Sequence, residues 1–343
     1  MRRLIALLTA GLMILALSGC QKQEAAAQIF AMDTVMDVAA CGGSAKKAVE
    51  QTEAEILRLE QLLSRTDADS EVSRLNEAGG APAAVSGEVE ELIRSAGEFS
   101  AATDGAFDIT IAPVVSAWGF TTDKYRVPEQ AELDALLAAV GMEHVTLADG
   151  QAALEGGARI DLGGIAKGYA SDAAAEIFDA HKVEHGKAAL GGNILLVGTK
   201  PDGTPWRVGV QDPARPNEEA YAAIVALENA FAVTSGSYQR YFEQDGTAYH
   251  HIIDPATGYP ADSGLTSVTV VTDRHSGSGT MCDALSTALF VMGEERALEF
   301  WRSGAYDFEL VLVTEDGRVV VTAGLESALT EIEESGYRYE IVS

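Results

Sequence analysis

Hydrophobic and polar residues follow two periods along this chain, which predicts helices and strands in irregular order. Apolar residues recur at helical spacing in residues 44–63, where Ile56, Leu59, Leu62 and Leu63 form one stripe. Further helices are expected at residues 86–102, 128–140, 164–180, 280–292 and 294–302. Short apolar runs predict strands at residues 30–41, 144–147, 152–154, 158–161, 187–190, 194–197, 206–210, 222–227, 248–253, 267–272, 308–313 and 318–321. This mixture, with hairpin-like spacing of the strands, indicates an α+β fold with mainly antiparallel sheets and packed helices.

The N-terminal residues 1–19 are typical of a targeting segment rather than of a folded domain. Two arginines precede a short apolar run, and Leu17-Ser18-Gly19-Cys20 resembles the lipobox of bacterial lipoprotein precursors. This resemblance implies cleavage before Cys20, a lipid on the Cys20 thiol, and a lipidated tether over residues 20–29. An uncleaved N-terminal anchor is the alternative. Both interpretations predict a membrane-anchored protein on the extracytoplasmic face of the cell envelope.

The rest of the chain reads as one unit. No internal repeat, low-complexity tract or proline- or serine-rich linker divides residues 30–343 in the sequence, so we predict a single domain there.

The composition is strongly acidic, with a formal net charge of −28 over 343 residues. Loss of Arg2 and Arg3 with the leader would take this charge to −30. Such a surface argues against nucleic acid and against anionic lipid headgroups as partners. An anionic substrate would therefore need locally placed cations, backbone amides or a metal ion.

Cysteine usage gives little sign of a disulfide framework. Besides Cys20, the chain has only Cys41 and Cys282. A single bridge between these two is one alternative. The other, which we favour, is that Cys282 packs as a small apolar side chain beside Asp283.

A helix expected to be buried carries polar groups at residues 281–293. Asp283 and Thr287 are four residues apart, which places them on one helical face, one turn from each other. A buried carboxylate is costly unless it is paired or metal-bound. Two hard oxygen ligands at this spacing suit a hard cation such as Mg²⁺, so the helix suggests a metal-dependent active site.

A strand–turn–helix segment at residues 159–169 contains adjacent Gly163 and Gly164, preceded by Asp161 and followed by Lys167. Glycines at a helix start let backbone amides approach a phosphate, and a lysine can add a point charge. The segment is neither a Walker A loop nor a dinucleotide-binding fingerprint, because the required glycine spacings are absent. A phosphate cradle and a plain tight turn with a surface lysine both stay open.

Two further segments carry candidate binding groups. Trp118, between small residues, could form a platform for a purine or flavin ring or could simply pack in the core. One of His250 and His251, just before the turn that contains Thr257, could act as a general base or play a structural role. The sequence has no HExxH motif or cysteine pair, which argues against zinc.

Taken together, these segments resemble the ApbE-type FAD:protein FMN transferases. The matching segments are Ala31-Met32-Asp33-Thr34, Asp104-Gly105-Ala106-Phe107-Asp108, Asp161-Leu162-Gly163-Gly164-Ile165-Ala166-Lys167-Gly168, Leu190-Gly191-Gly192-Asn193, Thr234-Ser235-Gly236, His251-Ile252-Ile253-Asp254-Pro255-Ala256-Thr257-Gly258 and Asp283-Ala284-Leu285-Ser286-Thr287-Ala288. Their number and order, over nearly all of residues 30–293, make the match specific.

The resemblance implies an α+β fold related to the tunnelling fold and a defined activity. Such an enzyme uses Mg²⁺ to transfer FMN from FAD to a Ser or Thr hydroxyl of an extracytoplasmic flavoprotein, and AMP leaves. Implied acceptors belong to respiratory systems such as the Na⁺-pumping quinone reductase (Nqr) and Rnf-type complexes. The alternatives are an FAD pyrophosphatase, which yields FMN and AMP, and a lipid-anchored flavin-binding protein without turnover.

The resemblance also implies roles for individual residues. It assigns FAD binding to Met32, Ala117, Trp118, Gly119, Asp161, Lys167 and Thr257. It assigns Mg²⁺ to the Gly164 carbonyl, Asp283 and Thr287, with Ser286 close by. It assigns catalysis to His251 together with Asp283. One departure is Asp33, which stands where many members have glycine and adds a charge to that loop.

Overall fold

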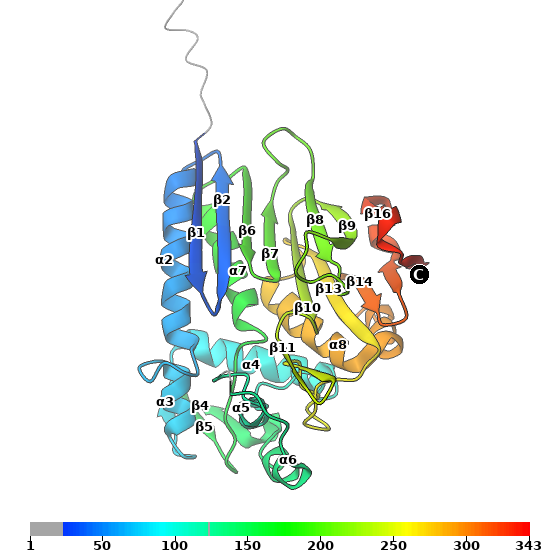
Figure 1. Ribbon diagram of the computed structural model, residues 1–343. Coiled ribbons are helices and arrows are strands. Elements are labelled where there is room, and N and C mark those ends of the chain that lie inside the picture. Colours follow the sequence, from blue (N-terminus) through cyan, green and yellow to red (C-terminus); the bar gives the residue numbers. More distant parts are fainter. Residues whose placement is uncertain (1–22, 123) are drawn as a thin grey trace, which may run out of the picture.

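A nine-stranded sheet forms the centre of the molecule (Figure 1). The computed structural model describes residues 23–122 and 124–343, so the predicted leader and Cys20 lie outside the described residues. In spatial order the strands are β1 (Glu24–Ala31), β2 (Thr34–Cys41), β6 (His185–Leu190), β7 (Asn193–Val197), β10 (Ala230–Gly236), β13 (Leu265–Asp273), β14 (Glu309–Thr314), β15 (Arg318–Thr322) and β17 (Arg338–Val342). Neighbouring strands are antiparallel except β15 and β17, which confirms the predicted α+β class.

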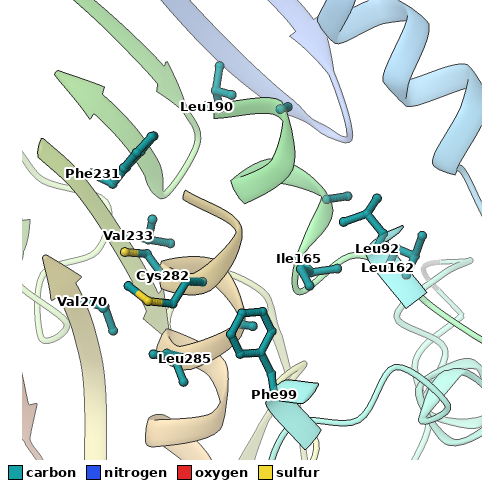
Figure 2. Close-up of a cluster of buried hydrophobic side chains, with 14 of the residues drawn as sticks. Leu92, Phe99, Leu162, Ile165, Leu190, Phe231, Val233, Val270, Cys282 and Leu285 are labelled. Carbon is teal, nitrogen blue, oxygen red and sulfur yellow. The ribbon is translucent and has the colours of Figure 1, made fainter. Parts of the chain in front are cut away.

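Helices cover one face of this sheet. They are α2 (Ala45–Leu63), α4 (Gly87–Ala102), α7 (Ala166–Ala180) and α8 (Gly279–Arg302). In α2 the predicted stripe faces inward, because Ile56, Leu59 and Leu63 are buried against the sheet layer. Figure 2 shows the interior of this layer, where Cys282 and Leu285 of α8 lie among side chains from the sheet and from α4. The labelled neighbours include Phe231, Val233, Val270, Leu92 and Phe99.

A second, smaller sheet packs on the opposite face. It consists of β8 (Trp206–Gln211), β9 (Tyr221–Leu227) and β16 (Leu329–Glu331). Its apolar side chains meet those of β7, β10, β13, β14 and β15 in a separate core. The smaller sheet therefore covers the central and C-terminal strands of the large sheet. The outer faces of β1 and β2 are not part of that core.

A smaller lobe lies below the hairpin formed by β1 and β2 (Figure 1). Its helices are α3 (Glu71–Glu77), α5 (Ala112–Trp118) and α6 (Gln130–Leu137). Its strands are β3 (Ala83–Ala84), β4 (Val145–Ala148), β5 (Gln151–Leu154), β11 (Tyr241–Gln244) and β12 (Thr247–His250). Short 3₁₀ turns occupy Met142–His144, Ala323–Ala328 and Glu333–Ser335. The described part of the chain contains no helix with the length and apolar character needed to cross a membrane.

The structure corrects several predicted boundaries. The single strand predicted over residues 30–41 is a hairpin, because Met32 and Asp33 take up left-handed backbone with φ of 48° and 58°. The tether predicted over residues 20–29 is wrong from Glu24 on, since β1 begins there and pairs with β2. The predicted strand at 158–161 contributes only an isolated bridge from Arg159 to Ile111. The helices predicted at 280–292 and 294–302 form α8, with a kink at Gly293.

Candidate active site

A cleft of about 1000 Å³ opens where the hairpin tip, the start of α7 and the N-terminal half of α8 approach each other. It also takes in Arg65 just after α2, the turn before β7, strand β10 and part of the smaller sheet. Among the predicted site residues, Met32, Asp161, Gly164, Lys167, His251, Asp283 and Thr287 line it. These seven residues come from distant parts of the sequence and share one cavity, and their individual roles stay predictions.

Asp283 sits on the buried face of α8 with only 4% of its surface exposed. Its carboxylate is held at both oxygens: Oδ2 accepts from the Gly168 backbone N–H at 2.8 Å, and Oδ1 accepts from the Asn193 amide at 3.2 Å. The hydrogen bond from Gly168 to Asp283 is possible because α7 packs closely on α8. A Cβ on Gly168 would lie 2.3 Å from the Gly279 carbonyl oxygen, so a side chain there would force the helices apart.

A cluster of hydroxyls continues from this carboxylate along α8. The Ser235 hydroxyl lies 2.8 Å from that of Ser286 and 3.3 Å from that of Thr287. Gly164 also lies close to this cluster, since a Cβ there would be 3.7 Å from the Thr287 hydroxyl. The three predicted metal-binding positions, Gly164, Asp283 and Thr287, are thus brought to one place.

The atoms gathered here that could bind a metal ion are all hard oxygen ligands. The Asn193 side-chain oxygen is buried beside Asp283 with no hydrogen-bond partner. Across residues 23–122 and 124–343, no three His, Cys, Asp or Glu side chains come together as a metal cluster. A single carboxylate with hydroxyl and carbonyl oxygens fits Mg²⁺, which commonly keeps waters and takes further oxygens from substrate phosphates.

Lys167, in the first turn of α7, and Arg65, just after α2, bring positive charge to this part of the cleft. Asp161 accepts a hydrogen bond from the Gly163 amide at 2.9 Å and forms an ion pair with Arg65 at 3.1 Å. Lys167 donates to the Gly163 carbonyl at 3.2 Å and lines the cleft. The Gly163 amide, predicted to face a phosphate, is thus occupied by Asp161. The Lys167 ammonium is therefore better placed than the Gly163 amide to bind an anionic ligand.

His251 faces this wall, and its surroundings keep it neutral. Its Nδ1 lies 3.2 Å from the Arg240 carbonyl oxygen, so an Nδ1–H tautomer donates there and leaves Nε2 as an acceptor. Burial lowers the pKa of His251 to about 3, and nearby positive charge on Arg240 and Lys167 adds to the effect. His250 has a structural role instead, because its Nε2 lies 3.1 Å from the Ala261 carbonyl oxygen.

The hairpin tip forms the mouth of the cleft. The Met32 amide donates to the Glu60 carboxylate at 2.7 Å, which ties the tip to α2. Asp33, largely exposed, forms an ion pair with Arg240 at 3.2 Å. The charge that Asp33 adds to this loop is therefore balanced across the mouth.

Comparison with known proteins explains this arrangement. The family model described as "ApbE family" matches residues 32–312, which is most of the chain. The chain belongs to the ApbE family. The FAD:protein FMN transferase of Haemophilus influenzae is 31% identical over 350 residues, which cover 97% of this chain and 100% of the relative. That of Vibrio cholerae is 36% identical over 253 residues, covering 73% of this chain and 74% of the relative.

Solved ApbE structures share the fold. An ApbE protein from Thermotoga maritima superposes with a TM-score of 0.81 at 33% identity, covering 91% of this chain and 100% of the other. The flavinyl transferase ApbE of Pseudomonas stutzeri, in its apo form, gives a TM-score of 0.78 at 30% identity and covers 91% of this chain and 98% of the other. The ApbE chain described here is accordingly an enzyme of the transferase class.

Four residues that the ApbE resemblance assigned to FAD do not line the cleft, namely Ala117, Trp118, Gly119 and Thr257. Trp118 is fully buried, donates to the Gly258 carbonyl at 2.8 Å, and packs against Tyr249 and Tyr259. Of the two alternatives for Trp118, the structure shows core packing of the ring. Phe120, just after this segment, does reach the cleft. Contact of the four residues with FAD stays a prediction.

Other cleft residues of this ApbE chain were missed as individual site residues. They are Glu60, Arg65, Asn193, Ser235 and Arg240. Asn193 and Ser235 lay within segments that carried the family resemblance, but nothing in their spacing pointed to Asp283 or Ser286. Arg65 gave a weaker signal: it is a cation directly after a long helix in a strongly acidic chain. Both cysteines of the described residues, Cys41 and Cys282, are buried and free, so no bridge joins them.

Proposed function

We propose that this ApbE-family enzyme transfers FMN from FAD to a Ser or Thr hydroxyl of an acceptor protein, with release of AMP, in a Mg²⁺-dependent reaction. The observation that carries the proposal is the convergence of Asp283, Thr287 and Lys167 on one side of a cleft that also holds a neutral His251. The relatives named FAD:protein FMN transferase, at 31% and 36% identity, support the same activity.

Asp283, Thr287 and the Gly164 carbonyl are the residues that would hold the metal. Bound Mg²⁺ would neutralise charge on the pyrophosphate oxygens of FAD as a Lewis acid. Gly168 and Asn193 fix the Asp283 carboxylate in place before substrate binds, so little reorganisation is needed. Lys167, which lines the same cleft, would stabilise the charge that develops on the transferred phosphoryl group.

His251 supplies the base for the acceptor hydroxyl. In the Nδ1–H tautomer, Nε2 takes the hydroxyl proton as the acceptor oxygen forms its bond to the FMN phosphorus. The bond from that phosphorus to the bridging oxygen breaks, and AMP leaves with that oxygen. Because the pKa of His251 is about 3, the imidazole is in its basic form throughout the neutral pH range, although it is a weak base.

We further propose that the enzyme works on the extracytoplasmic face of the cell envelope, anchored through a lipid on Cys20. The leader and its resemblance to a lipobox support this location. Acceptors on that face would be flavoproteins of respiratory, Rnf-type or Nqr-type complexes. The strongly acidic surface is consistent with partners other than nucleic acid.

The test is incubation of the purified enzyme with FAD, Mg²⁺ and the flavin-accepting domain of an Rnf-type subunit. We expect flavin fluorescence on the acceptor band in a denaturing gel, together with AMP. Asp283→Ala should lose both, whereas Glu295→Ala, which removes an exposed carboxylate from the same helix, should retain them. AMP release without labelled acceptor would favour the pyrophosphatase, and stable bound FAD without AMP would favour a flavin-binding protein.

A further inference from the structure

Large apolar side chains on the surface are concentrated beside the cleft. Among the described residues, six such side chains are exposed: Phe30, Val35, Leu57, Tyr125, Tyr241 and Ile341. Phe30 is 70% exposed and Val35 is 52% exposed. A single exposed apolar residue is ordinary. The position of Phe30 and Val35 is unusual, because both belong to the hairpin whose tip forms the mouth of the cleft.

The register of the hairpin places Phe30 and Val35 together. They lie directly opposite each other in the antiparallel pair, so their side chains project from the same face at close range. That face is the outer one, since their neighbours Ala31 and Met36 are fully buried on the other side. Phe30 and Val35 thus form an apolar surface only two residues from Met32 and Asp33, which line the cleft.

Tyr241 is a third exposed apolar residue, on the segment that reaches the hairpin tip through Arg240. It is 44% exposed and directly follows Arg240, whose guanidinium meets Asp33 at 3.2 Å. We call Phe30, Val35 and Tyr241 the rim. Its members come from residues far apart in sequence, and the ion pair between Asp33 and Arg240 links their two segments.

We propose that the rim is the docking surface for the acceptor protein and that it binds apolar side chains flanking the acceptor Ser or Thr. This rests on the proposed function, in which a protein hydroxyl must enter the cleft. A protein that presents its hydroxyl there must contact the hairpin tip. Aromatic side chains at such a border are typical of binding hot spots.

Two other occupants fit the rim less well. A second copy of the chain seated on the rim would cover the mouth and block the acceptor. An anionic membrane surface would approach a strongly acidic molecule, with a formal net charge of −28. An apolar contact with the acceptor avoids both conflicts, and its strength should depend little on ionic strength.

The test compares Phe30→Ser with Ile341→Ser. Ile341 is the control, because it is an apolar residue, 41% exposed, on β17, the edge strand at the opposite side of the sheet from β1. With the flavin-accepting domain of an Rnf-type subunit as substrate, we expect Phe30→Ser to raise KM for that domain about tenfold or more, as loss of a buried aromatic contact implies. The kcat, the affinity for FAD and the unfolding temperature should stay close to the wild-type values.

The outcomes separate the two proposals. A wild-type enzyme that never labels the acceptor overturns the proposed function, and the docking proposal with it. A wild-type enzyme that labels the acceptor, with an unchanged KM in Phe30→Ser, overturns the docking proposal alone. Sedimentation of the wild-type and Phe30→Ser enzymes, alone and with vesicles, adds a second criterion. If Phe30→Ser changes self-association or vesicle binding and leaves KM for the acceptor unchanged, the rim belongs to one of those partners instead.

Discussion

Two side chains in the cleft show how neighbours set the chemistry of single residues. Asp283 is buried, and two hydrogen bonds fix its carboxylate. His251 lies on the wall of the cleft, and desolvation there lowers its pKa to about 3. An imidazolium is therefore disfavoured in the folded protein, and the neutral ring keeps its acceptor nitrogen available. The desolvation that keeps His251 neutral should also make stability depend on pH.

His251 should destabilise the protein as the pH falls. In the unfolded chain its pKa returns to about 6.5, so the unfolded state takes up a proton below that pH while the folded state does not until about pH 3. The stability contribution of the neutral ring is present above pH 6.5 and is lost progressively towards pH 3. We expect His251→Gln to lose less free energy of unfolding than wild type between pH 7.5 and pH 5, by at most about 1.4 kcal/mol per pH unit.

Urea unfolding at a series of pH values measures this difference. His275→Gln is the control, because His275 is an exposed histidine. Identical pH slopes for wild type and His251→Gln would show that the folded protein accommodates the imidazolium and that the lowered pKa is wrong.

Sequence could predict the residues of this site better than their contacts. Asp283 and Thr287 stood out because a carboxylate and a hydroxyl share one face of an otherwise apolar helix. Asn193 did not stand out, because its relevance comes from a hydrogen bond to a residue 90 positions away. Trp118 did stand out in the sequence, but its contacts could not be predicted either. Small flanking residues suggested a slot, but the fold filled the space with other aromatic rings.

At the scale of elements, α7 positions α8. The N-terminal amides of α8 need acceptors, and Asp172 of α7 provides them. Its carboxylate accepts from the Gly279 amide at 2.6 Å and from the Thr280 amide at 2.9 Å, and it also meets the Thr280 hydroxyl. Ser278 caps the Met281 amide at 3.1 Å. The helix that carries Asp283 is thereby held in register with the turn that carries Gly164.

Removal of this cap should weaken the fold. Asp172→Ala leaves two helix-terminal amides without acceptors in a partly buried position, so we expect a loss of about 2 kcal/mol in the free energy of unfolding. Urea denaturation measures the loss. Glu176→Ala, one turn later on α7 and exposed, should change it little. Equal effects of the two substitutions would mean that water replaces the Asp172 carboxylate without cost.

Element types were easier to predict than the points where strands turn. Apolar periodicity located α2, α4 and α8 within a few residues, since each has a strong stripe or a good cap such as Ser86. The hairpin between β1 and β2 was missed because its turn uses Met32 and Asp33 rather than glycine. Left-handed backbone is uncommon at Met, and a single Asp is only a weak turn signal.

At the scale of the whole molecule, the site depends on strand order. Strands β2 and β6 are neighbours although α2, α4 and α7 lie between them in the chain. This order brings the hairpin tip to the start of β7, with Gly191 against Thr34. Alternation and turn signals could predict antiparallel sheets, but not this order, because pairing of distant strands depends on the packing of the complete core.

The same topology leaves the cleft bridged by one exposed ion pair. Asp33 and Arg240 are 207 positions apart in sequence, and their side chains meet at 3.2 Å across the mouth. An exposed pair contributes at most about 1 kcal/mol. A modest contact of this kind can still slow the opening of the mouth and thus the release of a bound dinucleotide.

We therefore expect Asp33→Asn and Arg240→Gln each to speed FAD release by up to about fivefold, since about 1 kcal/mol corresponds to that factor. Asparagine suits position 33 because it tolerates the left-handed backbone there. The double variant should release FAD no faster than either single variant, because the same interaction is lost in all three. Stopped-flow flavin fluorescence measures the rates, and high salt should bring the release rate of wild type towards those of the variants.

Arg126→Gln, which breaks an exposed ion pair with Glu132 away from the cleft, is the control. Additive effects of the two single substitutions would mean that each side chain acts on FAD separately and that the pair does not close the mouth.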